Sequence, residues 1–299
     1  MIDQIIETAW DEYRGWAKRA RALQSSSQNW NKIALYCAVA AAILGAAATQ
    51  ASGDPPLGQA LSLAAAVAAA LVPVLGREIL SLGGEAKYIR ARATAEAIKS
   101  ECYRLAAAAG DYAGTDAASK FSRRLEALTD EAIKAAIAPL ADPVVDKGDR
   151  RRPSTPLDVE WYKSNRIDDQ IKFFTTGQIK HEEAVTRLRY LSVGASVLAA
   201  AFGAAGAIDP EMFAPWIAAL TTIATTVAAY GLMERRQYLA ASYGAMATSL
   251  GRIKGIAGSL SAKDFVAQAE DLLQSEHAAW TERMTKTIPA PPAAARTRS

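Results

Sequence analysis

Four threonines form the deepest polar cluster in the apolar part of this sequence. Thr221, Thr222, Thr225 and Thr226 lie in residues 212–232, a stretch that contains no Asp, Glu, Lys, Arg or His. On a helix they form two i,i+4 pairs on neighbouring stripes. Their hydroxyls can bond back to carbonyls of their own helix, link neighbouring helices, or line a wet path through a membrane. A pore lining is the interpretation that would carry function, and the other two stay open.

Two glutamates occupy corresponding places in the two halves of the chain. Glu78 follows the apolar stretch 57–76, and Glu234 follows the stretch 212–232. In a symmetric oligomer they would repeat as rings of charge at the inner mouth of a pore, where such rings bias the choice of ion. Ordinary helix-end charges are the alternative explanation.

The residues needed for enzymatic or metal chemistry are missing from the sequence pattern. We find no phosphate-binding glycine loop after a strand, no cluster of Cys and His, and no nucleophile motif. His181 is a lone histidine beside Gln178, and we expect a satisfied polar contact in helix packing. We therefore predict that the protein is not an enzyme and has no catalytic residue, metal or cofactor. The net charge of +3 is too small to indicate a nucleic-acid partner.

Four stretches free of ionisable residues dominate the chain, although 22% of all residues are charged. They are residues 33–50, 57–76, 191–208 and 212–232, each 18 to 21 residues long. A helix of this length, at about 1.5 Å per residue, just crosses a hydrocarbon core of about 30 Å. Because the stretches come in two closely spaced pairs, we predict an all-α membrane protein with two transmembrane hairpins. A soluble, alanine-rich bundle is the alternative.

Charges around the hairpins all favour one orientation. The hairpin loops carry Asp54, Asp209 and Glu211 but no Lys or Arg, whereas every other flank is basic. Under the positive-inside rule both loops face outward, and both termini are cytoplasmic. Proton-coupled pumps and many transporters need ionisable residues inside the membrane, and the four stretches contain none. A passive pore needs none.

The chain divides into two halves of similar design. We predict a first two-transmembrane repeat over 1–138, a linker over 139–157, a second repeat over 158–288 and a disordered tail over 289–299. Each half has a polar helical lead-in, a hairpin and a helical run-out. Two spans return the chain to the side on which it began, so the repeats are parallel.

Spacing within the second half predicts how its long helices pack. No residue other than isolated glycines interrupts the helix between residues 158 and 208, so the lead-in and third span can form one rod. Phe174, Gln178 and His181 belong to a seam with alternating spacings of four and three, which predicts a partner helix. In the run-out, glycines follow heptad-like spacing and favour close approach of backbones; they are Gly244, Gly251, Gly255 and Gly258.

Two cytoplasmic segments carry a family resemblance. The second half opens with WYKSNRIDDQIKFF (161–174), and the first half continues after its hairpin with YIRARATAEAIKSECYRL (88–105). These segments resemble the SLATT family, the two-transmembrane effectors associated with SMODS nucleotide synthases and SLOG nucleotide sensors. The resemblance covers both halves, as tandem copies. The family-like positions are Arg92, Glu96, Lys99, Arg166, Asp169 and Gln170.

The resemblance implies a function in bacterial conflict. SLATT proteins are predicted to form membrane pores that arrest or kill an infected cell when a nucleotide signal or a partner activates them. We therefore expect a homo-oligomeric pore in the bacterial inner membrane, opened by a nucleotide second messenger or by a sensor or synthase partner. The main alternative is a non-conducting scaffold, whose hairpins are anchors and whose cytoplasmic helices recruit partners.

Overall fold

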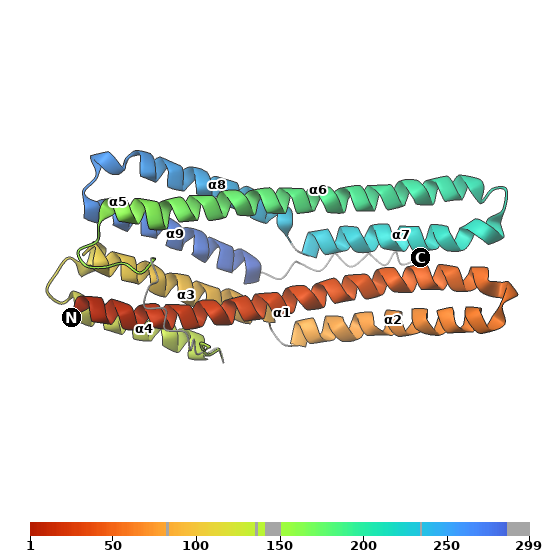
Figure 1. Ribbon diagram of the computed structural model, residues 1–299, viewed down its shortest axis with the longest axis horizontal. Coiled ribbons are helices and arrows are strands. Elements are labelled where there is room, and N and C mark those ends of the chain that lie inside the picture. Colours follow the sequence, from red (N-terminus) through yellow and green to blue (C-terminus); the bar gives the residue numbers. More distant parts are fainter. Residues whose placement is uncertain (82–83, 135–136, 141–150, 234, 286–299) are drawn as a thin grey trace, which may run out of the picture. The chain divides into compact units, whose positions relative to one another are not determined.

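The computed structural model describes residues 1–81, 84–134, 137–140, 151–233 and 235–285, and within these it leaves out the side chains of residues 52, 77–81, 84, 85, 233, 284 and 285. The described residues are almost entirely helical and contain no strand. The helices are α1 (Ile2–Gln50), α2 (Pro55–Ser81), α3 (Gly84–Ala106), α4 (Ala117–Lys134), α5 (Val159–Tyr162), α6 (Asp168–Ala205), α7 (Pro210–Met233), α8 (Arg236–Gly255) and α9 (Ala262–Thr285) (Figure 1). The predicted all-α class is confirmed. The predicted tail, residues 289–299, lies outside the described residues.

The chain forms two compact units, and each draws on both halves of the sequence. Unit 1 contains residues 1–23, 85–159 and 257–299, and unit 2 contains residues 24–84 and 160–256. Helix α1 belongs to unit 1 over its first turns and to unit 2 over the rest. The division into sequence repeats, with a linker at 139–157, stays a prediction.

Unit 2 contains both hairpins, and each turns back on itself in the same way. Asp54 accepts a hydrogen bond from the backbone N–H of Leu57, and Asp209 accepts one from Met212. A proline follows each aspartate and opens the next helix, where its fixed φ and missing N–H cost nothing. The two hairpin loops are thus the same Asp-Pro helix start.

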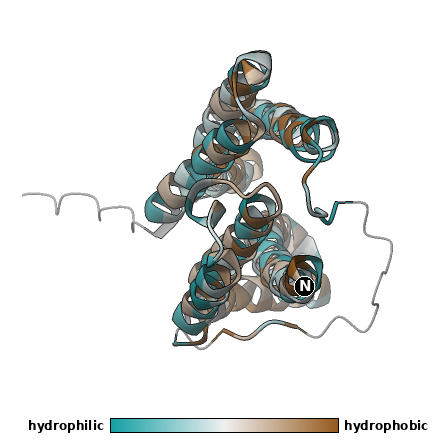
Figure 2. Ribbon diagram, turned by 90° about the vertical axis from the view of Figure 1, so that its left-hand side faces the viewer, coloured by the Kyte–Doolittle hydropathy of each residue, from teal (hydrophilic) through white to brown (hydrophobic). Residues whose placement is uncertain are grey.

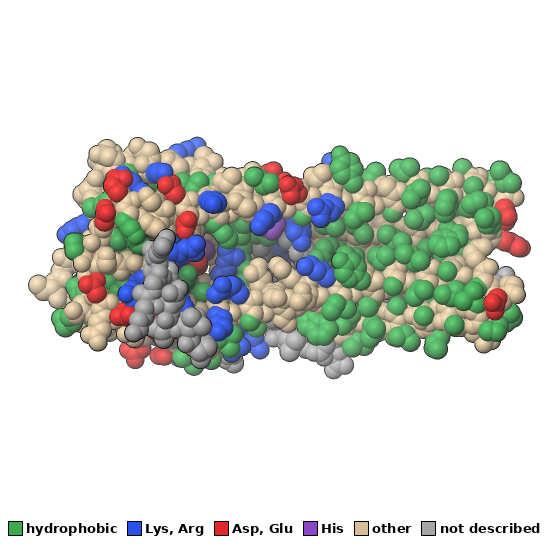
Figure 3. All heavy atoms as spheres, in the orientation of Figure 1, with side chains coloured by type: hydrophobic (Ala, Val, Ile, Leu, Met, Phe, Trp, Pro, Cys, Tyr) green, Lys and Arg blue, Asp and Glu red, His purple; other side chains and the backbone are tan. Residues whose placement is uncertain are grey.

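Four helices are long and apolar enough to cross a membrane, as predicted. Their apolar side chains lie on the surface. Val67, Val197 and Leu198 are each more than half exposed. Soluble proteins rarely expose so large a continuous apolar surface to water, so this surface is typical of contact with lipid. In Figure 3 hydrophobic side chains cover the hairpins, Lys and Arg gather at the end of the hydrophobic region opposite to the hairpin loops, and Asp and Glu lie at the loops. This charge distribution is the one on which the predicted orientation rests.

The predicted rod of the second half is nearly continuous. Residues Val159–Ala205 form one long helical segment, interrupted in geometry by a π-helical turn at Lys163–Ile167. Arg166 and Ile167 in this turn are buried. Helix α6 then packs along both α7 and α8.

Unit 1 is a small helical bundle with an aromatic core. Trp10 of α1 meets Tyr103 of α3 edge to face, with ring centroids 5.8 Å apart, and Phe121 of α4 is fully buried. The residues beyond the predicted linker's centre also dock here, since Arg152 pairs with Glu7 at 2.8 Å. Coloured by hydropathy, these helices carry hydrophilic and hydrophobic residues on the same turns (Figure 2), as amphipathic helices do.

Candidate functional site

Three of the four threonines of α7 face outward from the chain. The hydroxyl of Thr221 donates to the carbonyl of Ile217, that of Thr222 to Ala218, and that of Thr225 to the carbonyls of Thr221 and Thr222. All three residues are exposed, and Thr226 is half-buried. The hydroxyl donors are therefore satisfied by carbonyls of their own helix, which is the first of the three arrangements expected from the sequence. Each hydroxyl oxygen can still accept a hydrogen bond.

The exposed face of α7 differs in kind from the exposed faces of the other spans. Between Met212 and Leu232 no large hydrophobic residue of α7 is exposed among the described residues, whereas α2 exposes Leu63 and Val67. The exposed positions of α7 are instead small, and in order they are Ala214, Ala218, Thr221, Thr222, Thr225, Ala228 and Ala229. These seven residues, the Ala/Thr face, follow helical spacing along one side of α7. Such a face suits close helix packing or water better than it suits lipid tails.

The predicted inner-mouth glutamates cannot be placed. Glu78 belongs to α2, but its side chain lies outside the described residues, and Glu234 lies outside them entirely. The proposed rings of charge stay a prediction.

The first group of family-like residues lies in a polar seam between α3 and α9. The guanidinium of Arg92 lies 5.0 Å from the ring centroid of Trp280 and donates to the hydroxyl of Tyr88 at 2.8 Å. Glu96 lies 3.8 Å from Nε2 of His277. Lys99 is 6% exposed and lies over the ring of Tyr13 of α1.

The same seam continues along both helices. The amide of Gln274 donates to Ser100 at 3.0 Å, and Arg104 pairs with Asp271 at 2.6 Å. Positions four apart on α3 thus meet positions three apart on α9, the spacing at which two helices keep one face together. Sequence analysis missed this seam, although the spacing was legible in the sequence, because nothing in it indicated which distant helix was the partner.

One buried carboxylate anchors α3 within unit 1. Glu101 is 8% exposed and accepts a hydrogen bond of 2.5 Å from the hydroxyl of Tyr112, and Arg124 lies 3.6 Å away. Burial, and then the bond to Glu101, raise the pKa of the Tyr112 phenol well above its usual range. Tyr112 therefore keeps its proton and remains the donor in this bond.

The second family-like group surrounds the start of α6. Arg166 is 1% exposed within the π-helical turn, while Asp169 and Gln170 are half-buried on the first turn of α6. Between them Asp168 binds the ammonium of Lys254, near the end of α8, at 2.5 Å. The ion pair that joins α6 to α8 is therefore made by Asp168, the residue before the predicted family-like position Asp169.

The seam predicted on α6 meets α8 of the same chain. The ring of Tyr243 lies over Gly177, and the side chain of Gln178 lies over Gly244. His181 meets Tyr243 edge to face at 5.5 Å between centroids. Burial, and then Arg236, lower the pKa of His181. The expected helix-packing contact is present, but Nδ1 of His181 is buried without a hydrogen-bond partner among the described residues, so the expected satisfied polar contact is not. Of the predicted glycine seam, only Gly244 makes a close contact; a Cβ at Gly251, Gly255 or Gly258 would meet nothing within 4 Å.

The described residues contain no group of three His, Cys, Asp or Glu that could hold a metal ion. The two cysteines, Cys37 and Cys102, are free thiols. The candidate site is therefore made of helix faces: the Ala/Thr face in the membrane and the interhelical seams outside it.

Comparison with known families identifies the second half. Residues 162–280 match the family described as SMODS and SLOG-associating 2TM effector domain 1. This segment is a SLATT domain. This match spans α6, α7, α8 and most of α9, so it covers the third and fourth spans and the seam on α6.

The first half matches a family described as a protein of unknown function (DUF4231), over residues 12–120. The predicted SLATT membership is thus carried by the second half, and the first hairpin falls in the second match. Searches of curated proteins and of solved structures found no match.

Proposed function

We propose that this SLATT protein is the pore-forming effector of a bacterial defence system. In this proposal several copies assemble in the inner membrane with both termini in the cytoplasm, and the protein acts without enzymatic chemistry. The family match supports a two-transmembrane effector that works beside nucleotide synthases and sensors. The trigger is accordingly a nucleotide second messenger or a sensor or synthase partner acting on the cytoplasmic helices.

One observation carries the pore itself. Within one chain, the exposed surface of the membrane-spanning helix α7 is the Ala/Thr face, and this face carries no large apolar side chain. Lipid tails gain little from a face of small residues and hydroxyls, so a second copy or water is its better neighbour. Cyclic symmetry would repeat α7 around an axis, and the hydroxyl oxygens of Thr222 and Thr225 would then line a polar path.

In this proposal the cytoplasmic seams transmit the trigger to the membrane helices. Helix α3 follows the first hairpin, and α9 follows the second hairpin through α8. Because the seam joins α3 to α9 within unit 1, a ligand or partner that separates or tightens it acts on both hairpins. Such a seam is polar along its length, and polar contacts exchange with water at lower cost than an apolar core does.

Ion flux through liposomes tests the proposal. The purified full-length chain, reconstituted with the candidate nucleotide or partner, is expected to release an enclosed ion. Thr222→Asp or Thr225→Asp is expected to shift the flux towards cations, because a carboxylate would join the pore wall. Thr248→Asp is the matched control, since Thr248 is an exposed, back-bonded threonine of α8 outside the spans.

A non-conducting scaffold is the second candidate. The back-bonding of Thr221, Thr222 and Thr225 favours it, because hydroxyls bonded to their own helix can pack against another helix without water. Liposomes that stay tight under every trigger, together with aspartate variants that lose only their assembly, would support the scaffold and reject the pore.

A further inference from the structure

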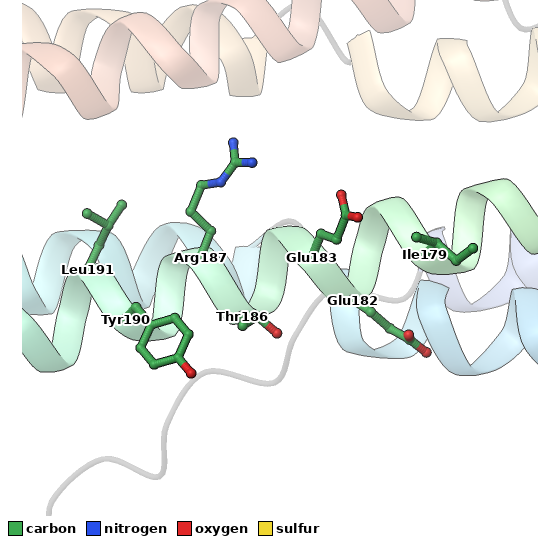
Figure 4. A pocket seen from close by; sticks show the side chains of 7 residues that line it. All are labelled: Ile179, Glu182, Glu183, Thr186, Arg187, Tyr190 and Leu191. Atoms are coloured by element: carbon green, nitrogen blue, oxygen red, sulfur yellow. The ribbon is translucent and has the colours of Figure 1, made fainter.

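A groove runs along α6 at the inner end of the third span. It is lined by Ile179, Glu182, Glu183, Thr186, Arg187, Tyr190 and Leu191 (Figure 4). The spacing places these residues in two neighbouring rows on one side of the helix. Residues that α6 turns towards α7 and α8, such as His181 and Ser192, lie on a different face.

Four of the five polar side chains of this groove have no partner among the residues that the structure describes. Within the described part of the chain, the side chains of Glu183, Thr186, Arg187 and Tyr190 make no hydrogen bond or ion pair. Tyr190 is 74% exposed, and Glu183 and Arg187 are also exposed. Glu183 and Arg187 are one turn apart, yet they do not pair with each other. Glu182 differs, because it accepts a hydrogen bond of 2.8 Å from Gln178.

The chemistry changes in a fixed order along one row of the groove. Leu191 begins the charge-free stretch, Arg187 lies one turn towards the cytoplasmic side, and Glu183 lies one turn further. Successive positions are about 6 Å apart along the helix. From the membrane outward the row therefore offers an apolar side chain, a cation and an anion. The same row continues into the membrane over Gly194, where a Cβ would meet nothing within 4 Å, to exposed Leu198.

We propose that this groove binds a phospholipid whose headgroup ends in a primary ammonium, the ethanolamine class. Such a lipid presents acyl chain, phosphate and ammonium in the order in which the row presents Leu191, Arg187 and Glu183. The guanidinium binds the phosphate, and the carboxylate accepts charge-assisted hydrogen bonds from the ammonium. The hydroxyl of Tyr190 donates to the phosphate or an ester oxygen at the interface, where tyrosine is favoured. One acyl chain lies over Gly194 and Leu198.

Other lipid classes fit the groove less well. A glycerol headgroup offers no cation to Glu183 and brings its negative charge close to two carboxylates, those of Glu182 and Glu183. A choline headgroup has the right charge, but it has no N–H to donate. The proposal needs α6 to lie in a bilayer, and it does not depend on whether the assembled protein conducts ions.

Lipid binding to the purified full-length chain tests the proposal. Native mass spectrometry in detergent measures the affinity of short-chain lipids with ethanolamine, choline or glycerol headgroups. We expect the ethanolamine lipid to bind tightest. Arg187→Gln is expected to weaken all three by about fivefold or more. Glu183→Gln is expected to weaken only the ethanolamine lipid and to remove its advantage over the glycerol lipid.

Arg189→Gln is the matched control. Arg189 is another exposed arginine, two residues along α6, where the helix turn places it on the opposite side from Arg187. It is expected to leave all three affinities unchanged. Equal losses in Arg187→Gln and Arg189→Gln would show a general attraction to cationic residues and overturn the proposal. Competition by soluble phosphoethanolamine at the concentration of the lipid would overturn it as well, because the ligand would then be a water-soluble phosphate.

Discussion

Replacing Gly177 with alanine tests the close contact between α6 and α8. A Cβ at this position would lie 2.4 Å from Cδ2 and 2.6 Å from Cε2 of Tyr243. The ring cannot move aside cheaply, because its centroid lies 5.8 Å from that of Phe173, 5.3 Å from Phe174 and 5.5 Å from His181. The added methyl group must therefore displace a packed ring or push the helices apart.

Two effects of opposite sign set the magnitude. Overpacking a well-filled contact costs about 1–3 kcal/mol, whereas alanine gains about 1 kcal/mol over glycine inside a helix. The first effect is the larger here, so we expect a net loss of up to about 2 kcal/mol in the free energy of unfolding. At about 2–4 °C per kcal/mol, Tm should fall by several degrees. Thermal unfolding of the full-length chain in detergent, followed by circular dichroism, measures this shift.

Two glycines of α8, Gly251 and Gly244, provide the matched series. Gly251 is exposed and a Cβ there would meet nothing within 4 Å, so Gly251→Ala should raise stability by up to about 1 kcal/mol. Gly244→Ala should fall between the two, because its Cβ would lie 2.8 Å from the flexible end of Gln178, which can swing away and lose its bond to Glu182. A rise in Tm for Gly177→Ala as large as that for Gly251→Ala would refute the close packing of α6 on α8.

Two further predictions concern buried polar groups. Tyr112→Phe removes the 2.5 Å bond to buried Glu101 and should cost about 1.5–3 kcal/mol in urea unfolding, while Tyr36→Phe, on a 67% exposed ring, should cost little; equal effects would contradict the buried bond. Burial, and then Arg236, lower the pKa of His181, so the folded protein binds fewer protons than the unfolded chain near and below the ordinary pKa of 6.5. Stability should therefore fall as pH drops through this range, and His181→Gln should remove part of that fall in Tm; a pH profile unchanged by the substitution would argue against a lowered pKa of His181.

Local patterns predicted the membrane part of the fold well. The absence of ionisable residues located all four spans. Burying a charge in lipid is costly, so ionisable residues are excluded along the whole length of a spanning helix. The four-and-three spacing of Phe174, Gln178 and His181 also located a packed face. It could not show that α8 was the partner, because spacing on one helix does not identify the helix that covers it.

Long-range pairing was beyond the sequence patterns. Ser100 and Gln274 meet across 174 positions, and each is an ordinary polar residue on its own helix. The heptad-like glycines gave a partly misleading signal, since Gly244 approaches α6 closely whereas Gly251, Gly255 and Gly258 face open space. The helix Ala117–Lys134 was not singled out, although its residues form part of unit 1.

Cysteine accessibility in membranes tests the central claim most directly. Thr222→Cys, Thr225→Cys and Val197→Cys, each in a chain with Cys37 and Cys102 replaced by serine, are treated with a membrane-impermeant thiol reagent in native membranes. A water-filled path along α7 predicts that positions 222 and 225 react and that position 197, 62% exposed on an apolar face of α6, stays protected by lipid. Protection of all three positions would contradict the pore, and reaction at all three would contradict membrane insertion itself.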